Sequence, residues 1–211
     1  MTIGEHYTKI FEYFATHSPE PVTELHYQNS FQLLVAVILS AQCTDKRVNM
    51  VTPALFEAFP SPELLKDASF DEVFALIKSI SFPNNKSKHL IAMAKTLFED
   101  YQSIVPESID ELQKMQGVGR KTANVISSVV YNKPAMAVDT HVFRVSKRLG
   151  LVNSEAKTPL EVERELMQHI PTEIVAKAHH WLILHGRYTC TARKPKCEIC
   201  GLTKICPSFI K

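Results

Sequence analysis

The apolar residues of this chain recur with helical spacing along almost its whole length. Near the N-terminus Ile10 and Phe14 share one helical face, and the stretch 31–41 is apolar enough to form a buried central helix. Alternating strand patterns are scarce, and the one rival, at 129–131, ends a helical pattern. The spacing therefore predicts an all-α fold built of short helices with short connections.

Turn signals such as Phe59-Pro60-Ser61-Pro62 divide the remaining sequence into further helical patterns. Helices are predicted at 48–58, 62–67, 71–79, 86–100, 108–115, 121–131, 140–149, 159–169 and 173–184. With 45% hydrophobic and 22% charged residues, the composition is that of a folded globular protein, and 211 residues allow one large domain or two small ones. The first residues lack the pattern of a secretory leader, and the most apolar stretch is shorter than the roughly 20 residues that span a membrane, so we expect a cytoplasmic protein.

The positive charges gather in two segments. Lys and Arg number 24 against 22 Asp and Glu, for a net charge of +2. Residues 112–150 nevertheless carry +6 and residues 186–211 carry +5, which leaves −9 on the remainder. A localised positive surface can steer a protein toward a polyanion without a high net charge, whereas chance clustering on solvated helix faces would need no partner.

The segment Gln116-Gly117-Val118-Gly119-Arg120-Lys121-Thr122-Ala123 lies between two helical patterns. Two glycines one residue apart allow a tight turn with positive φ and a close approach of a ligand to the main chain. The helix that follows directs its free N–H groups and positive dipole end at that turn, which favours a phosphate group. Most Gly-x-Gly turns are simple connectors, but Arg120 and Lys121 in the next turn indicate a helix-hairpin-helix that binds a nucleic-acid backbone.

Two charged residues stand at predicted helix starts. Lys121 lies where cations are ordinarily disfavoured and beside Arg120, and both effects favour the neutral, nucleophilic amine; a solvated lysine that contacts phosphate is the alternative. Asp139 directly precedes the helical pattern at 140–149 and suits its N-cap. Accepting backbone N–H bonds would keep that carboxylate rigid and ionised.

Cys190, Cys197, Cys200 and Cys206 form a C-x6-C-x2-C-x5-C array. Four thiolates suit either zinc or an iron–sulfur cluster. Structural zinc sites commonly pair two C-x2-C motifs, whereas this array has one, which favours the cluster and leaves zinc open. Disulfides are the weakest alternative in a reducing cytosol. Cys43, just after the apolar stretch, is predicted to be a free, partly buried thiol.

Together, these motifs closely resemble those of the endonuclease III family. The matching segments are Leu39-Ser40-Ala41-Gln42, Gly117-Val118-Gly119-Arg120-Lys121-Thr122-Ala123-Asn124, Val138-Asp139-Thr140-His141, His180-Trp181-Leu182-Ile183-Leu184-His185-Gly186-Arg187-Tyr188 and the cysteine array. The resemblance runs from about Pro21 to Cys206. It implies a bifunctional DNA glycosylase and abasic-site lyase that removes oxidised pyrimidines from duplex DNA in base excision repair.

The resemblance also implies the helix-hairpin-helix DNA glycosylase fold, in which two helical modules flank a DNA-binding cleft. A six-helix barrel module would span 22–134 and include the hairpin at about 112–131. Residues 1–21 and 135–211 would form a second module, with a 4Fe-4S cluster loop at 190–206. The target base would be flipped into the cleft, because its reacting C1′ atom is inaccessible in the stack. We expect a monomer that acts on damaged double-stranded DNA and has no membrane partner.

By the same resemblance, Lys121 attacks C1′, displaces the base and forms a Schiff base, from which β-elimination cuts the strand. Asp139 would stabilise the cationic sugar and help to activate Lys121. Gln42 would fill the gap left by the flipped nucleotide, and Phe82 would wedge into the stack. The four cysteines would hold the cluster. DNA contacts are further expected from Gly117, Val118, Gly119, Arg120, His141, Arg144, Arg187, Arg193, Lys194 and Lys196.

Two segments depart from the family pattern. Met115-Gln116 stands where leucine and proline usually precede the first hairpin glycine, so the turn is less preorganised. The wedge region reads Ser81-Phe82-Pro83 instead of Gly-Leu-Tyr, which leaves the lesion and opposite-base preferences open.

Two other functions compete with this interpretation. An adenine-mismatch glycosylase shares the hairpin and the cluster, but it normally lacks the lysine found here as Lys121, carries a glutamate where Ala36 stands and has a further C-terminal domain. A non-catalytic helix-hairpin-helix protein would only bind DNA, which the presence of both Lys121 and Asp139 disfavours.

Overall fold

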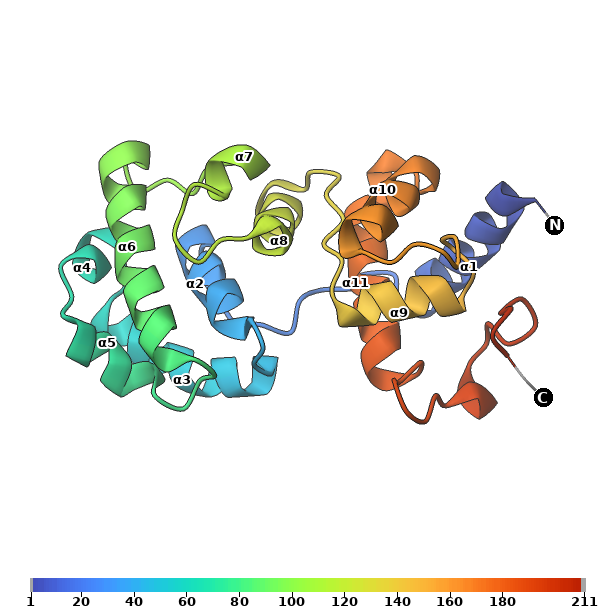
Figure 1. The fold of residues 1–211 in the computed structure, drawn as a ribbon, viewed down its shortest axis with the longest axis horizontal. Helices are drawn as coiled ribbons and strands as arrows, with labels where there is room; N and C mark the ends of the chain where they lie inside the picture. The colour runs from blue at the N-terminus through green and yellow to red at the C-terminus, as the bar shows by residue number, and fades with distance from the viewer. Residues whose placement is uncertain (1, 210–211) are drawn as a thin grey trace. The chain divides into compact units, whose positions relative to one another are not determined.

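The computed structural model describes residues 2–209 and, over that range, contains α-helices and 3₁₀ helices but no strand (Figure 1). The predicted all-α class is confirmed, and the segment 129–131 ends a helix. None of the helices described is both long and apolar enough to cross a membrane. The chain divides into two compact units: a continuous one, Glu24–Tyr131, and a discontinuous one formed by Met1–Thr23 and Asn132–Lys211.

The continuous unit is organised around a single buried helix. Its elements are α2 (Ser30–Ser40), α3 (Asp45–Ala58), α4 (Pro62–Lys66), α5 (Phe70–Ile77), α6 (Pro83–Tyr101), α7 (Ile109–Leu112) and α8 (Arg120–Tyr131). Every residue of α2 from Phe31 to Leu39 is buried, and all of them except Gln32 are apolar, so the helix has no face suited to water. Helices α3, α6 and α8 pack against it. The central helix predicted within 31–41 is thereby confirmed.

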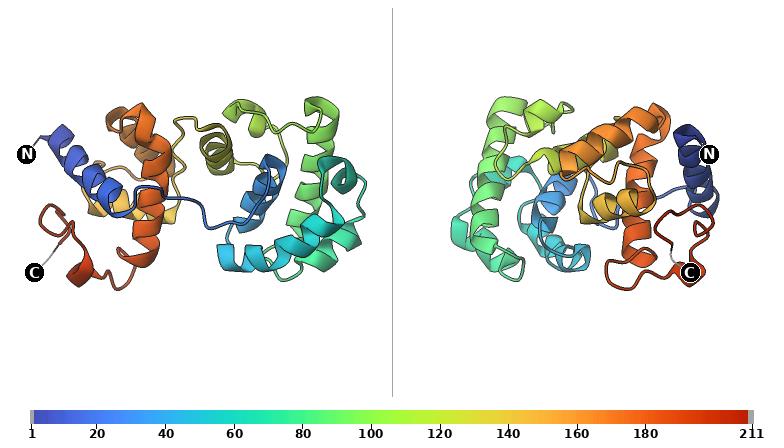
Figure 2. Two further views of the ribbon diagram at one scale, coloured as in Figure 1. Left: turned by 180° about the vertical axis from the view of Figure 1, so that it is seen from behind. Right: turned by 45° about the vertical axis from the view of Figure 1, so that its right-hand side comes forward.

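The discontinuous unit joins the N-terminal helix to the C-terminal third of the chain. Its elements are α1 (Ile3–His17), α9 (Thr140–Arg148), α10 (Pro159–His169), η1 (Thr172–Ile174), α11 (Val175–Tyr188) and η2 (Cys197–Ile199). Within this unit α1 lies beside segments more than a hundred residues away in the sequence, as all the views show (Figures 1 and 2). Helix α1 therefore depends on long-range packing.

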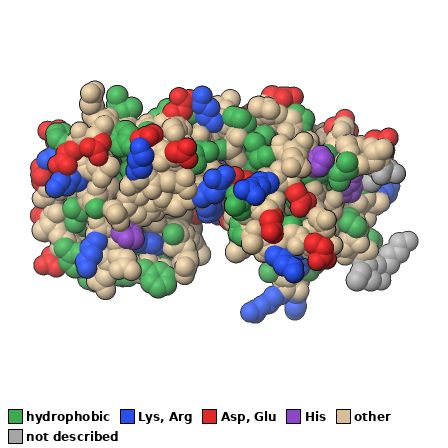
Figure 3. Space-filling view, turned by 45° about the horizontal axis from the view of Figure 1, so that its top comes forward, with side chains coloured by type: hydrophobic (Ala, Val, Ile, Leu, Met, Phe, Trp, Pro, Cys, Tyr) green, Lys and Arg blue, Asp and Glu red, His purple; other side chains and the backbone are tan. Residues whose placement is uncertain are grey.

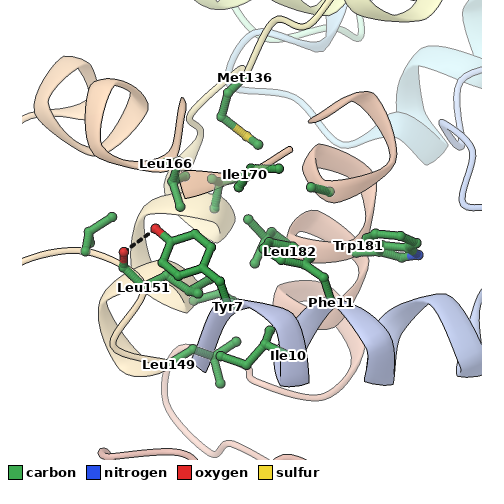
Figure 4. Packing of buried hydrophobic residues seen from close by; sticks show 14 of the residues in the cluster. Tyr7, Ile10, Phe11, Met136, Leu149, Leu151, Leu166, Ile170, Trp181 and Leu182 are labelled. Atoms are coloured by element: carbon green, nitrogen blue, oxygen red, sulfur yellow. Dashed lines mark hydrogen bonds between the residues drawn. The ribbon is translucent and has the colours of Figure 1, made fainter. Parts of the chain in front are cut away.

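Aromatic side chains of α1 hold it in this unit. Figure 4 shows Tyr7 and Phe11 directed at side chains of the C-terminal helices, and Tyr7 donates a hydrogen bond to the carbonyl oxygen of Leu151. Phe14 stacks on Trp181 with ring centroids 6.2 Å apart, and the Trp181 indole N–H donates to Ser18 O at 2.6 Å. Burying each large apolar side chain contributes about 2 kcal/mol to the free energy of unfolding, so these contacts hold α1 in the discontinuous unit.

Candidate functional site

The predicted hairpin connects α7 and α8, and its two glycines differ. Gly117 has φ +79°, and a Cβ there would lie 3.0 Å from the Cβ of His89, so both backbone and space favour glycine. The prediction that Gly119 also takes a positive φ is wrong. Gly119 directly precedes α8, and its carbonyl already accepts the helical bond from Ala123 N at 2.9 Å, so its backbone leads straight into the helix. A Cβ at Gly119 would meet no atom within 4 Å.

Helix α8 presents Lys121 on its outer face. Arg120 and Lys121 are its first two residues and both are exposed, whereas residues 122–128 are buried against the unit. Val118 is only 6% exposed, so any DNA contact at this position would come from its main chain. The hairpin therefore places the exposed amine of Lys121 close to the exposed residue Gly119, at a helix N-terminus where anions are favoured.

Asp139 is the N-cap of α9, which confirms the predicted capping role. Its Oδ1 atom accepts hydrogen bonds from the backbone N–H groups of His141 and Val142, both at 2.8 Å. The carboxylate is half-buried. Two N–H donors hold it in one orientation, and a cap of this kind stabilises a protein by about 1 kcal/mol.

Arg144 ties α9 to the end of α11. Its guanidinium donates to Gly186 O at 2.8 Å and to Cys190 O at 3.1 Å, and it lies 3.3 Å from the His141 ring nitrogen. Gly186 allows this close approach, because a Cβ there would lie 2.8 Å from the Cβ of His141. The element that carries Asp139 is therefore bonded directly to the first residue of the cysteine array.

The four cysteines of the array line one cavity of about 190 Å³ at the end of α11. All of them are free thiols, as is the half-buried Cys43. Burial raises the pKa of the Cys200 and Cys206 thiols, so ionising them requires a compensating positive charge, which a metal centre supplies.

The array suits a polynuclear centre better than a single ion. Four thiolates on one zinc would converge to within roughly 3.8 Å of each other, given Zn–S bonds of about 2.3 Å. In the part of the chain that the structure describes, no three His, Cys, Asp or Glu side chains form a group that could hold one metal ion. The four cysteines instead line one cavity, which suits a cluster with several irons.

Two residues around this cavity were not singled out from the sequence. Arg148 donates to Thr191 O at 2.7 Å and Ala192 O at 2.8 Å, and one guanidinium nitrogen lies 3.5 Å from Cys190 Sγ. Burial lowers the pKa of His185 to about 4, so its ring is neutral where it lies 3.9 Å from Cys200 Sγ. The spacing of Arg148, one helical turn after Arg144, was the available signal for its position.

The basic residues of the cysteine loop differ in exposure. Arg193, Lys194 and Lys196 are exposed, whereas Arg187 at the end of α11 is half-buried. On the face drawn in Figure 3, Lys and Arg side chains stand out in several groups among small apolar patches. The loop therefore presents cations to solvent, as predicted for a polyanion-binding segment.

Gln42 and Phe82 share an unusual backbone conformation. Both are exposed, with φ of 55° at Gln42 and 56° at Phe82. Phe82 is 58% exposed and is the N-cap of α6, so it is not a core residue. Left-handed conformations at residues other than glycine cost free energy and are held by surrounding structure, often at functional sites.

Two family models match the chain. The one described as HhH-GPD superfamily base excision DNA repair protein covers residues 35–172, and the one described as iron-sulfur binding domain of endonuclease III covers residues 190–206. The second match confirms the predicted 4Fe-4S cluster at the cysteine array.

Comparison with individual proteins points to the same family. The chain is 52% identical over 201 residues to endonuclease III of Rickettsia felis, covering 95% of this chain and 93% of that protein. It is 41% identical over 190 residues to endonuclease III of Escherichia coli, covering 90% and 89%. The solved structure of a trapped endonuclease III–DNA covalent intermediate, an estranged-adenine complex, has a TM-score of 0.92 at 42% identity over 99% of this chain and 97% of that one. The chain therefore belongs to the endonuclease III family and is a DNA glycosylase and abasic-site lyase of base excision repair.

Proposed function

We propose that this enzyme removes oxidised pyrimidines from duplex DNA, with Lys121 as the nucleophile and Asp139 as the carboxylate that stabilises the cationic sugar. One observation carries the assignment: the chain presents an exposed lysine on the first turn of the hairpin helix and a carboxylate held by two backbone N–H groups at the start of α9. A similar protein was solved as a trapped covalent intermediate with DNA, which supports a reaction through a covalent nucleophile, the role proposed for Lys121.

The reaction uses the neutral amine of Lys121. Its Nζ forms a bond to C1′ of the damaged nucleotide while the bond between C1′ and the base breaks, and the base leaves with the electron pair and takes up a proton. Opening of the sugar ring gives a Schiff base between Nζ and C1′. Loss of a proton from C2′ then expels the 3′ phosphate, and water releases the lysine.

Asp139 acts through its charge. The sugar becomes cationic as the base departs, and a carboxylate with one fixed orientation stabilises that charge without reorganising. The N–H bonds from His141 and Val142 supply this orientation.

The remaining predicted residues bind and shape the DNA. The hairpin main chain and the start of α8 would bind backbone phosphates, while Gln42 fills the gap left by the flipped nucleotide and Phe82 wedges into the stack. When bound, the 4Fe-4S cluster held by Cys190, Cys197, Cys200 and Cys206 organises the cationic loop. The enzyme would act as a monomer in the cytoplasm, and its free cysteines are consistent with a reducing compartment.

Borohydride trapping tests this assignment. The wild-type enzyme should give a covalent complex with a duplex that contains thymine glycol, because borohydride reduces the Schiff base to a stable amine. Lys121→Ala should abolish the complex. Lys114→Ala is the matched control, since Lys114 is another exposed lysine near the hairpin, paired with Glu111 at 2.7 Å. Trapping that persists in Lys121→Ala, or base release without strand cleavage by the wild type, would contradict the proposal.

A further inference from the structure

One buried lysine of the continuous unit has no part in the reaction described above. Lys86, on α6, is only 5% exposed. Its Nζ donates hydrogen bonds to Leu39 O at 2.8 Å and to Ala41 O at 2.6 Å. Burial lowers the pKa of this amine, because removing the charged form from water costs free energy. Buried charges in proteins are paired or hydrogen-bonded, and removing one leaves its buried partners unsatisfied.

The partners of Lys86 lie at the end of α2. That helix has no basic residue in its last turn, although its terminal carbonyls are unpaired within the helix and carry the negative end of its dipole. Lys86 supplies the missing cation from another helix. The Ala41 carbonyl belongs to the peptide plane that joins Ala41 to Gln42, so this hydrogen bond fixes the orientation of the plane at which the left-handed residue Gln42 begins.

The backbone of Lys86 contacts the second left-handed residue. Its N–H donates to Phe82 O at 3.1 Å, the bond that starts the first turn of α6. Phe82 has no side-chain capping bond, and the turn that carries it is set by this contact and by Pro83 in the next position. One residue is thus bonded to the loops that carry Gln42 and Phe82, through its side chain on one side and its main chain on the other.

We infer that Lys86 is a positioning residue that sets the spacing between Gln42 and Phe82, the two side chains that enter the duplex at the flipped nucleotide. The inference rests on the proposed roles of Gln42 and Phe82. Two groups that must enter one base stack together need a fixed separation, and misplacement by about 1 Å can cost roughly 100-fold in rate. A hydrogen-bonded cation between the loops supplies that rigidity.

The test compares two substrates of the same enzyme. A duplex with thymine glycol requires both side chains to enter the stack, whereas an abasic site in single-stranded DNA requires only the lyase chemistry of Lys121. Lys86→Met should lower the single-turnover rate on the duplex by roughly 10- to 100-fold and leave the rate on the single strand unchanged. A loss of folded enzyme would lower both rates together.

Three further variants sharpen the result. Lys177→Met is the matched control, because the Lys177 amine also binds a backbone carbonyl, Pro19 O at 3.1 Å, but in the other unit and outside both basic segments; its ratio of duplex to single-strand rates should match the wild type. Gln42→Ala should lower the duplex rate selectively, and adding it to Lys86→Met should cause little further loss, because both act on one insertion step. Lys86→Arg keeps the charge but changes the length, and it should show a smaller selective loss.

A fluorescent base gives an independent readout. With 2-aminopurine opposite the lesion, insertion of Gln42 unstacks the orphaned base and raises its fluorescence, and Lys86→Met should reduce this rise. If Lys86→Met fails to fold, the ratio of the duplex rate to the single-strand rate in Lys86→Arg tests the inference instead. The inference is overturned if the folded Lys86 variants keep the wild-type ratio while Gln42→Ala lowers it. If Gln42→Ala and Phe82→Ala both keep that ratio, the proposed roles themselves fail, and the inference fails with them.

Discussion

Asp139 serves both helix α9 and the proposed reaction, and two substitutions separate these roles. Asn at this position keeps an oxygen that can accept the N–H bonds from His141 and Val142, so Asp139→Asn should change the free energy of unfolding by less than about 0.5 kcal/mol. Asp139→Ala removes the cap and should cost about 1 kcal/mol. Because both remove the negative charge, both should slow base excision by roughly 100-fold or more.

Thermal unfolding and single-turnover excision of thymine glycol measure the two effects. Thr158→Ala is the control, since Thr158 caps α10 in a capping box. It should lower stability like Asp139→Ala and leave excision unchanged. Excision by Asp139→Asn at the wild-type rate would show that the charge has no part in catalysis.

Residues differ in how far the sequence predicts their roles. The capping role of Asp139 is local, since its two donors follow within three positions, and the sequence therefore predicts it. Lys86 binds carbonyls 47 and 45 residues away. Backbone acceptors have no sequence signature, so the position of this amine emerges only from the fold. Likewise, the left-handed backbone of Phe82 emerges only from the fold, because aromatic residues rarely adopt this conformation.

The hairpin between α7 and α8 allows a prediction about two glycines. Gly117→Ala should lower the free energy of unfolding by about 1–2 kcal/mol, because the residue is left-handed and its Cβ would crowd His89. Gly119→Ala should leave stability near the wild-type value, since the space around it is open, but its methyl group would stand where the proposed phosphate approaches. DNA affinity should fall for Gly119→Ala. Equal unfolding midpoints for the two variants would contradict this assignment.

The segment 189–206 has little regular secondary structure and depends on its metal centre. It contains only the short η2, and the hydrogen bonds from the Arg144 and Arg148 side chains reach just its first residues, Cys190 to Ala192. Removing iron should therefore expose the loop to trypsin after Arg193 and Lys196, while the Lys194–Pro195 bond resists cleavage. The helices should stay protected, because α11 packs on the apolar core. Mass spectrometry of the fragments checks this, and equal protection with and without iron would count against a loop organised by the cluster.

At the level of the whole molecule, periodicity predicts helices but not which of them pack together. Helix α1 belongs with residues 132–209 through contacts such as Tyr7 to Leu151, 144 residues apart. The apolar face of α1 shows that it is buried without naming its partner. The pairing was expected from the family resemblance alone, since many distant segments of this chain offer an equally apolar face.

The charge distribution of the whole chain predicts how DNA binding depends on salt. A net charge of +2 would give weak steering, but the two basic segments carry +6 and +5 against −9 elsewhere. Each phosphate neutralised by a cation releases counterions and adds about 0.9 to the slope of log affinity against log salt.

In the Lys121→Ala background, which prevents turnover, Lys194→Ala and Lys196→Ala should each reduce that slope by about 0.9, because both lysines are exposed on the cysteine loop. Lys157→Ala should leave the slope unchanged, since this exposed lysine lies outside both basic segments. An affinity that does not change with salt would mean that the basic segments do not contact DNA.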